Sequence, residues 1–99
     1  MALKNDEGHE PKGIYEVIIS KPAAKVLQSL ADDYILKIEK QVNALAENPR
    51  PRGCEKLSGT DNRYRIRVGV YRIIYSVYDA KLVIDILYID HRKNIYKKR

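Results

Sequence analysis

The most constraining feature of the sequence is an alternating segment at residues 62–79, which reads NRYRIRVGVYRIIYSVYD. Side chains two residues apart in a β-strand point to the same face of a sheet. Arg63, Arg65 and Arg67 therefore share one face of a predicted strand, and the apolar residues between them share the other. The segment predicts a β-hairpin with one core face and one cationic face.

The predicted turn of this hairpin brings two arginines together. If Gly69 and Val70 are the central residues of a tight turn, Arg67 lies directly opposite Arg72. Like charges directly opposite each other destabilise a sheet. The sequence therefore predicts either that carboxylates neutralise the pair or that this face is kept for an anion. The candidates for neutralisation are Asp85 and Asp90.

Length and composition favour one small, basic domain. The chain has 99 residues, a formal net charge of +6 and a single cysteine. We expect residues 1–13 to be a flexible extension and residues 14–99 to form one domain. The positive charge favours a polyanion or an acidic protein as partner. Without an apolar run typical of a signal peptide or membrane span, we expect a cytoplasmic protein with no membrane contact.

Secondary-structure signals before the hairpin are clear. Residues 15–20 (YEVIIS) predict a strand that joins the later sheet, and residues 21–31 predict a helix with Ser20 as its N-cap. Asp32 and Asp33 are expected to cap a second amphipathic helix that ends at residues 47–49, before a proline. Residues 49–62 predict a loop.

A third consecutive strand follows the hairpin at residues 81–90. A turn centred on Ala80 and Lys81 puts Ile84, Ile86 and Tyr88 on the core face, with Ile89 and His91 on the arginine side. This register delivers His91 and Arg92 to the end of the sheet that holds Arg67 and Arg72.

The predicted fold class is α+β. Its order is a strand, a two-helix hairpin and a three-stranded antiparallel meander, with the helices packed on one face.

Three segments resemble the RelE branch of the RelE/ParE toxin superfamily of toxin-antitoxin modules. They are EKLSG at residues 55–59, YRIRVGVYRIIYSVYD at residues 64–79 and IDHRKNIYKK at residues 89–98. The resemblance implies a fold like that of microbial ribonucleases and cleavage of messenger RNA in the ribosomal A site. It also implies neutralisation by an acidic, RelB-like antitoxin.

The resemblance assigns roles to individual residues. The catalytic residues that it implies are Arg65, Arg67, Arg72, Arg92 and Tyr96, and the proton-transfer chemistry of the implied reaction adds His91 to these candidates. Further candidates for RNA binding are Lys56, Arg63, Lys93 and Lys97. The best-known members carry lysines where this chain has Arg65 and Arg67.

The implied reaction is attack of a ribose 2′-OH on the adjacent phosphate, with no metal and no other cofactor. Arginine suits the stabilisation of the phosphorane because its guanidinium is permanently charged and forked. It suits proton transfer poorly, since its pKa is above 12. His91 or Tyr96 is therefore expected to carry the protons, although Tyr96 can also stack on a base.

Two other interpretations stay open at this point. A toxin of the ParE kind would share the fold and bind DNA gyrase without catalysis. A degenerate member would bind only an antitoxin. Structural roles are also open for the site residues: a solvated strand face for Arg63 and Arg65, a strand-end position for His91 and packing of the tail for Tyr96.

Overall fold

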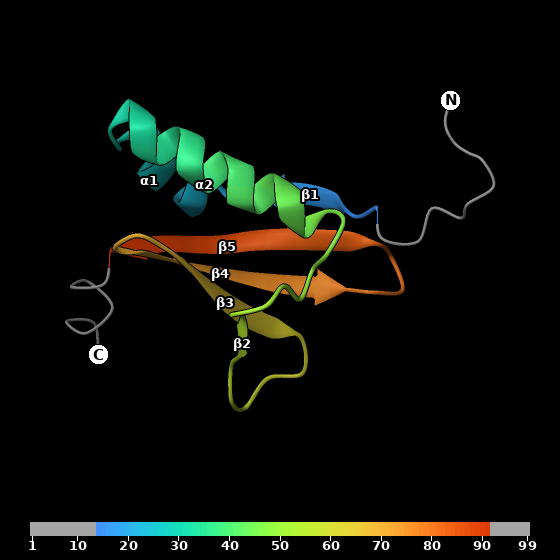
Figure 1. Ribbon diagram of the computed structural model, residues 1–99. Coiled ribbons are helices and arrows are strands. Elements are labelled where there is room, and N and C mark those ends of the chain that lie inside the picture. The colour runs from blue at the N-terminus through green and yellow to red at the C-terminus, as the bar shows by residue number, and fades with distance from the viewer. Residues whose placement is uncertain (1–13, 92–99) are drawn as a thin grey trace, which may run out of the picture.

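A computed structural model describes residues 14–91 (Figure 1). The predicted extension at residues 1–13 lies outside the described residues, as do the site candidates Arg92, Lys93, Tyr96 and Lys97. The elements, in order, are β1 (Glu16–Ile19), α1 (Lys21–Gln28), α2 (Asp32–Leu45), β2 (Glu55–Lys56), β3 (Arg63–Val68), β4 (Tyr71–Tyr78) and β5 (Val83–His91).

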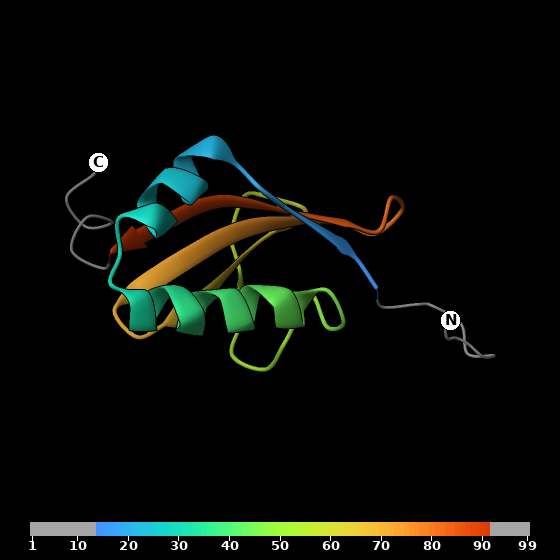
Figure 2. The same cartoon turned by 90° about the horizontal axis from the view of Figure 1, so that it is seen from above.

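The fold is α+β, with two helices over one face of a mixed five-stranded sheet (Figures 1 and 2). The strand order is β1-β5-β4-β3-β2, so the predicted antiparallel meander forms as β3, β4 and β5. β1 joins the sheet as predicted, parallel to β5. The other face of the sheet carries no described helix. Neither described helix is long and apolar enough to cross a membrane.

The central hairpin has the predicted register. Val68 pairs with Tyr71, and Arg67 pairs with Arg72. Gly69 opens the turn with a φ of 61°, a left-handed conformation that favours glycine. The side chains of β3 alternate as expected, because Tyr64 and Ile66 are buried under the helices while the arginines face away.

The core forms between the helices and the covered face of the sheet. The second helix is amphipathic as predicted, and α2 buries Ile38, Val42 and Leu45 on its apolar face. It packs over the apolar residues of the three central strands. Burial of this surface is the main force that holds two short helices on the sheet. The strand residues of this core are Tyr64, Ile66, Val68, Ile73, Tyr75, Val77, Ile84, Ile86 and Ile89.

Both helices end earlier than predicted. α1 ends at Gln28 because the N–H and hydroxyl of Ser29 turn back to the carbonyl of Val26, with the hydroxyl at 2.7 Å. α2 ends at Leu45, where the N–H groups of Glu47 and Asn48 both donate to a single carbonyl in a tight turn. These local hydrogen bonds satisfy the last carbonyls before Pro49 is reached.

The expected aspartate cap of α2 is wrong. The N-cap is Ala31, which makes no side-chain cap hydrogen bond. Asp32 and Asp33 lie in the first turn, and Asp33 accepts a hydrogen bond from the N–H of Tyr34 at 3.0 Å. Negative side chains in that turn still favour the helix through its dipole.

β5 contains a bulge that the sequence did not predict. Tyr75 pairs with Ile86, but Ile74 pairs with Tyr88, so Leu87 is the extra residue. The carbonyl of Leu87 accepts a hydrogen bond from the hydroxyl of Ser20 at 2.9 Å. This hydroxyl also accepts from Ala23, as the predicted N-cap of α1, so one side chain holds both the helix start and the bulge.

The bulge reverses the face of every later residue in β5. The expectation that Tyr88 faces the core is wrong: Tyr88 is 53% exposed, and Ile89 is 3% exposed in its place. The expectation that His91 lies on the arginine side is wrong for the same reason. Asp90 moves to the arginine side and pairs with Arg72.

The predicted loop at residues 49–62 contains the short strand β2. Glu55 pairs with Arg65, and Lys56 pairs with Tyr64. The strand adds only two residues to the sheet, which is too few for an alternation signal in the sequence.

An ion cluster fastens the beginning of this loop to the end of the sheet. Arg50 donates to Asp79 at 2.7 Å and 3.3 Å, and its Nε donates to the hydroxyl of Tyr64 at 2.9 Å. Tyr15 donates to the same carboxylate at 2.7 Å. These hydrogen bonds lower the pKa of Asp79, with Arg50 as the main cause and Tyr15 next.

The Gly69→Ala substitution should destabilise the fold more than Gly59→Ala. Both glycines have positive φ, at 61° and 78°. A Cβ at position 69 would lie 2.9 Å from Cε1 of Tyr34, whereas a Cβ at position 59 meets nothing within 4 Å. Denaturant unfolding should give a loss about 1 kcal/mol larger for Gly69→Ala.

Tyr34→Ala provides the control for this comparison. If Tyr34 causes the difference, Gly69→Ala should cost no more than Gly59→Ala in the Tyr34→Ala background. Equal losses for the two glycine variants in the native background would contradict the steric explanation.

Candidate functional site

Four arginines form a row on the face of the sheet opposite the two described helices. Alternation in β3 supplies Arg63, Arg65 and Arg67, and β4 adds Arg72 directly opposite Arg67. Arg72 is only 7% exposed, because β4 is the central strand and has neighbours on both sides. We call these four residues the arginine face. A guanidinium with so little contact with water favours an anion beside it.

Two carboxylates offset part of this charge. Asp90 lies opposite Arg72 in the register, so it takes the neutralising position that the sequence offered to either Asp85 or Asp90. Asp85 pairs with Ser76, farther from the turn. Glu55 on β2 pairs with Arg65 and forms a salt bridge with it. The arginine face is therefore partly neutralised and keeps a surplus of positive charge.

Glu55 is a site residue that the sequence did not predict. The hydrogen bond from Arg65 is the largest cause that lowers its pKa, and the charges of Arg65, Arg67 and Arg72 act in the same direction. A carboxylate with a lowered pKa is a weak general base at neutral pH. We therefore assign Glu55 to charge balance. Its pairing with Arg65 was hidden because β2 is so short.

His91 lies on the helix side of the sheet end. Its ring meets the ring of Tyr71 edge to face, with centroids 5.3 Å apart. Tyr71 in turn meets Tyr34 edge to face at 5.0 Å. Of the three rings, Tyr34 packs against the Gly69 turn, and Tyr71 and His91 are paired at the same end of the sheet. The rings lie on the other side of the sheet from Arg67 and Arg72.

The remaining candidates are dispersed. Arg63 belongs to the arginine face but pairs with Ser76, at the end of β3 away from the turn. Lys56 pairs with Tyr64, whose side chain is under the helices, so Lys56 lies on the opposite face from the arginines. Among residues 14–91, no three His, Cys, Asp or Glu side chains are grouped so that they could hold a metal ion.

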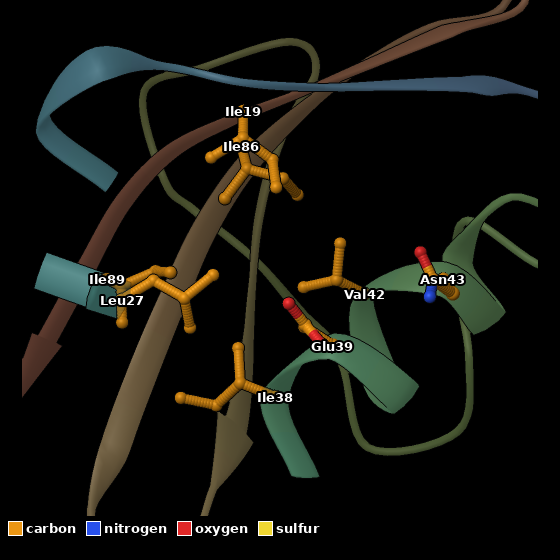
Figure 3. A pocket seen from close by; sticks show the side chains of 8 residues that line it. All are labelled: Ile19, Leu27, Ile38, Glu39, Val42, Asn43, Ile86 and Ile89. Carbon is orange, nitrogen blue, oxygen red and sulfur yellow. The ribbon is translucent and has the colours of Figure 1, made fainter. Parts of the chain in front are cut away.

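An apolar groove lies between α1, α2 and the sheet, on the side away from the arginine face (Figure 3). Its volume is about 270 Å³. Figure 3 shows that aliphatic side chains from both helices and the sheet point into it, while two polar residues of α2 stand at its rim. The lining residues are Ile19, Leu27, Ile38, Glu39, Val42, Asn43, Ile86 and Ile89.

The model of the family described as the ParE toxin of type II toxin-antitoxin systems matches residues 17–96. A relative from Methanocaldococcus jannaschii that carries the name RelE1 is 31% identical over 86 residues, which are 84% of this chain and 96% of the relative. The chain belongs to the RelE/ParE toxin family.

Solved structures agree with this assignment for the toxin. A chain in the crystal structure of the archaeal RelE–RelB complex from Pyrococcus horikoshii is 38% identical and matches with a TM-score of 0.73. The match covers 80% of the toxin and 96% of that chain. A chain in the RelB–RelE complex from Methanococcus jannaschii is 30% identical, with a TM-score of 0.64 and coverage of 83% and 98%.

Replacement of Arg65 by Gln should raise the pKa of Glu55 toward the ordinary glutamate value of about 4.3. In the native toxin this lowered pKa contributes stability above the unfolded-state value, and the contribution is lost as the pH falls through the folded-state pKa. Carboxyl NMR titration measures the change. Asp79 is the control, because its lowered pKa depends on Arg50 and should not move.

Proposed function

We propose that this toxin is a ribosome-dependent endoribonuclease that cleaves messenger RNA in the ribosomal A site and so inhibits translation in the cytoplasm. The observation that carries the proposal is the Arg67–Arg72 pair, held in register on the arginine face with Arg72 almost fully buried. Two forked cations side by side fit the oxygens of one phosphate.

The reaction follows from this charge. The ribose 2′-OH attacks the adjacent phosphorus, a base takes its proton, and an acid protonates the departing 5′-oxygen. The products are a 2′,3′-cyclic phosphate and a 5′-OH end. Arg67 and Arg72, together with Arg92, stabilise the extra negative charge of the phosphorane. This charge stabilisation comes from side chains and requires no metal ion.

The proton-transfer role goes to Tyr96 in preference to His91. His91 packs its ring against Tyr71 on the helix side, whereas the phosphate would lie on the arginine face. Tyr96 lies outside the described residues and takes this role from the family resemblance. Cations beside a tyrosine lower its pKa and so make its phenolate available as a base.

The ribosome completes the site. The arginine face is rich in cations, but Glu55 is held in a salt bridge with Arg65, and Asp90 lies opposite Arg72 in the register. A site of this kind gains most from a substrate whose 2′-OH is already aligned with the phosphate. Translating ribosomes supply a positioned messenger RNA strand in the A site.

The antitoxin is an acidic, RelB-like protein. Two matching structures are described as RelE–RelB complexes, and the net charge of +6 favours an acidic partner. The apolar groove of Figure 3 suits the apolar face of an amphipathic helix from this antitoxin. The antitoxin thus binds through apolar contact on the helix side of the toxin and through attraction between opposite charges.

Binding to DNA gyrase is the second candidate function, and the matching family model carries the ParE name. A gyrase-binding surface has no chemical need for two opposed arginines with one of them buried. The same argument counts against a toxin that only binds antitoxin. Induction of the toxin followed by primer extension on messenger RNA, beside a gyrase supercoiling assay, separates the three functions.

The Arg72→Ala substitution should reduce cleavage on translating ribosomes by about 100-fold or more, because a donor to the phosphorane is lost. Arg72→Lys keeps the positive charge but loses the fork, so it should restore part of the activity. Lys81→Ala is the control, since Lys81 lies in the β4–β5 turn at the other end of the sheet. Undiminished cleavage by Arg72→Ala, with a native circular dichroism spectrum, would contradict the assignment.

The Ile19→Ser substitution should weaken antitoxin binding about tenfold or more, because Ile19 lines the apolar groove and is 39% exposed. Leu36→Ser is the matched control, since Leu36 is 67% exposed and does not line the groove. Isothermal titration with the purified antitoxin measures both. Equal losses for the two variants would show that the groove is not the docking site.

A further inference from the structure

A basic groove lies between α2 and the β3–β4 turn, separate from the apolar groove. Its volume is about 390 Å³. Lysines from α2 form one wall, and the end of β3 with the turn glycine forms the other. None of the described residues that line it is a carboxylate. The lining residues are Lys37, Lys40, Gln41, Arg67, Val68 and Gly69.

The helix presents its polar groups to this groove on one face. Lys37, Lys40 and Gln41 have i, i+3, i+4 spacing, so their side chains are neighbours on α2. Tyr34, one turn earlier, packs its ring against the Gly69 turn, which positions this end of α2 against the hairpin. The ammonium of Lys37 lies 5.4 Å from the centroid of that ring. The orientation of α2 about its own axis therefore directs the side chains of Lys37, Lys40 and Gln41 toward the turn.

The three cations of the groove are not neutralised within the described chain. Among residues 14–91, no salt bridge involves Lys37, Lys40 or Arg67. Glu55 lowers the local charge only from a distance, because its hydrogen bond goes to Arg65. Three neighbouring cations without carboxylates favour the binding of an anion.

Arg67 connects the basic groove to the arginine face. It lies opposite Arg72 in the sheet, and it also lines the groove beside the two lysines. A strand of RNA with one phosphate on Arg67 and Arg72 would therefore have its next phosphates within reach of Lys37 and Lys40. Phosphate contacts of this kind set the register of a nucleic acid without reading its sequence.

We propose that the basic groove is a second phosphate-binding site, which holds the RNA backbone next to the scissile phosphate through Lys37, Lys40 and Gln41. This inference rests on the proposed ribonuclease function. The phosphates belong either to the messenger strand or to ribosomal RNA, which share the same chemistry. An antitoxin helix fits the groove less well, because the groove offers charge where such a helix needs apolar contact.

The test is the Lys37→Gln/Lys40→Gln double variant, which keeps good helix formers and removes two charges. Fluorescence anisotropy with a labelled single-stranded RNA of about twelve nucleotides should show about tenfold weaker binding at moderate salt. The slope of log K against log salt should become shallower by about 1.4, as expected for two lost contacts to single-stranded RNA. The Lys37→Arg/Lys40→Arg variant should restore both.

The matched control is Lys21→Gln/Lys25→Gln, which removes two lysines from α1 and changes the net charge equally. It should leave binding within about twofold of the native value. Equal weakening by the two double variants would overturn the proposal, because it would reflect net charge alone.

Parallel measurements identify the source of the phosphates. Vacant ribosomes hold no messenger RNA. Weaker binding to the short RNA with native affinity for vacant ribosomes therefore supports a messenger contact, and weaker binding to vacant ribosomes supports a ribosomal RNA contact. On translating ribosomes the double variant should raise KM about tenfold and leave kcat unchanged, since the lysines lie beside the reacting phosphate.

Native affinity for both RNA and ribosomes, or a loss confined to antitoxin binding, would overturn the proposal. The binding measurements do not depend on cleavage. If Arg72→Ala keeps full activity, the ribonuclease assignment fails while the groove is still judged by its own affinities.

Discussion

The arrangement of both faces of the sheet depends on the hydrogen bonds made by the Ser20 hydroxyl. It caps α1 and donates to the carbonyl of Leu87, the extra residue of the β5 bulge. A bulge leaves backbone groups without a ladder partner, so it persists where another group satisfies them. Beyond this point Ile89 enters the core and Asp90 reaches the side of Arg72. One hydrogen bond thus connects the start of a helix to the charge balance of the arginine face.

The arginine face combines repulsion with incomplete relief. Arg67 and Arg72 are opposed in the sheet, and Glu55 and Asp90 offset only part of the charge. A fully neutralised face would have little attraction for phosphate, whereas an unrelieved one would destabilise β3 and β4. Partial neutralisation of the arginine face therefore suits a site that must fold without its substrate and still bind a strong anion. The basic groove extends this surplus of positive charge toward α2.

Local chemistry made the fold class and the hairpin predictable. Gly69 determines the turn, and the turn determines that Arg67 meets Arg72, so the register follows from a few adjacent residues. The bulge was not predictable, because Ser20 and Leu87 are 67 residues apart and their hydrogen bond leaves no periodic signal.

In the candidate site too, features set by adjacent residues were predictable, and features set by residues far apart in the sequence were not. Arginines on one face follow from the period of two, but the positions of Asp90 and His91 depend on the bulge. Glu55 became part of the site through β2, which is too short to give a pattern. Tyr34 and the lysines of α2 join the sheet end only through tertiary packing, since their spacing alone is that of a solvated helix face.

The edges of the sheet have a consequence for how such a molecule behaves in a crowded cell. An uncovered strand edge can recruit a strand from another molecule and begin polymerisation. Here β1 has four residues and β2 has two. β1 runs directly into α1, the N–H of Tyr15 before it donates to Ala46, and β2 carries only charged side chains. Short, interrupted edges of this kind offer another molecule few backbone groups to pair with, so edge-to-edge association of the described sheet is disfavoured.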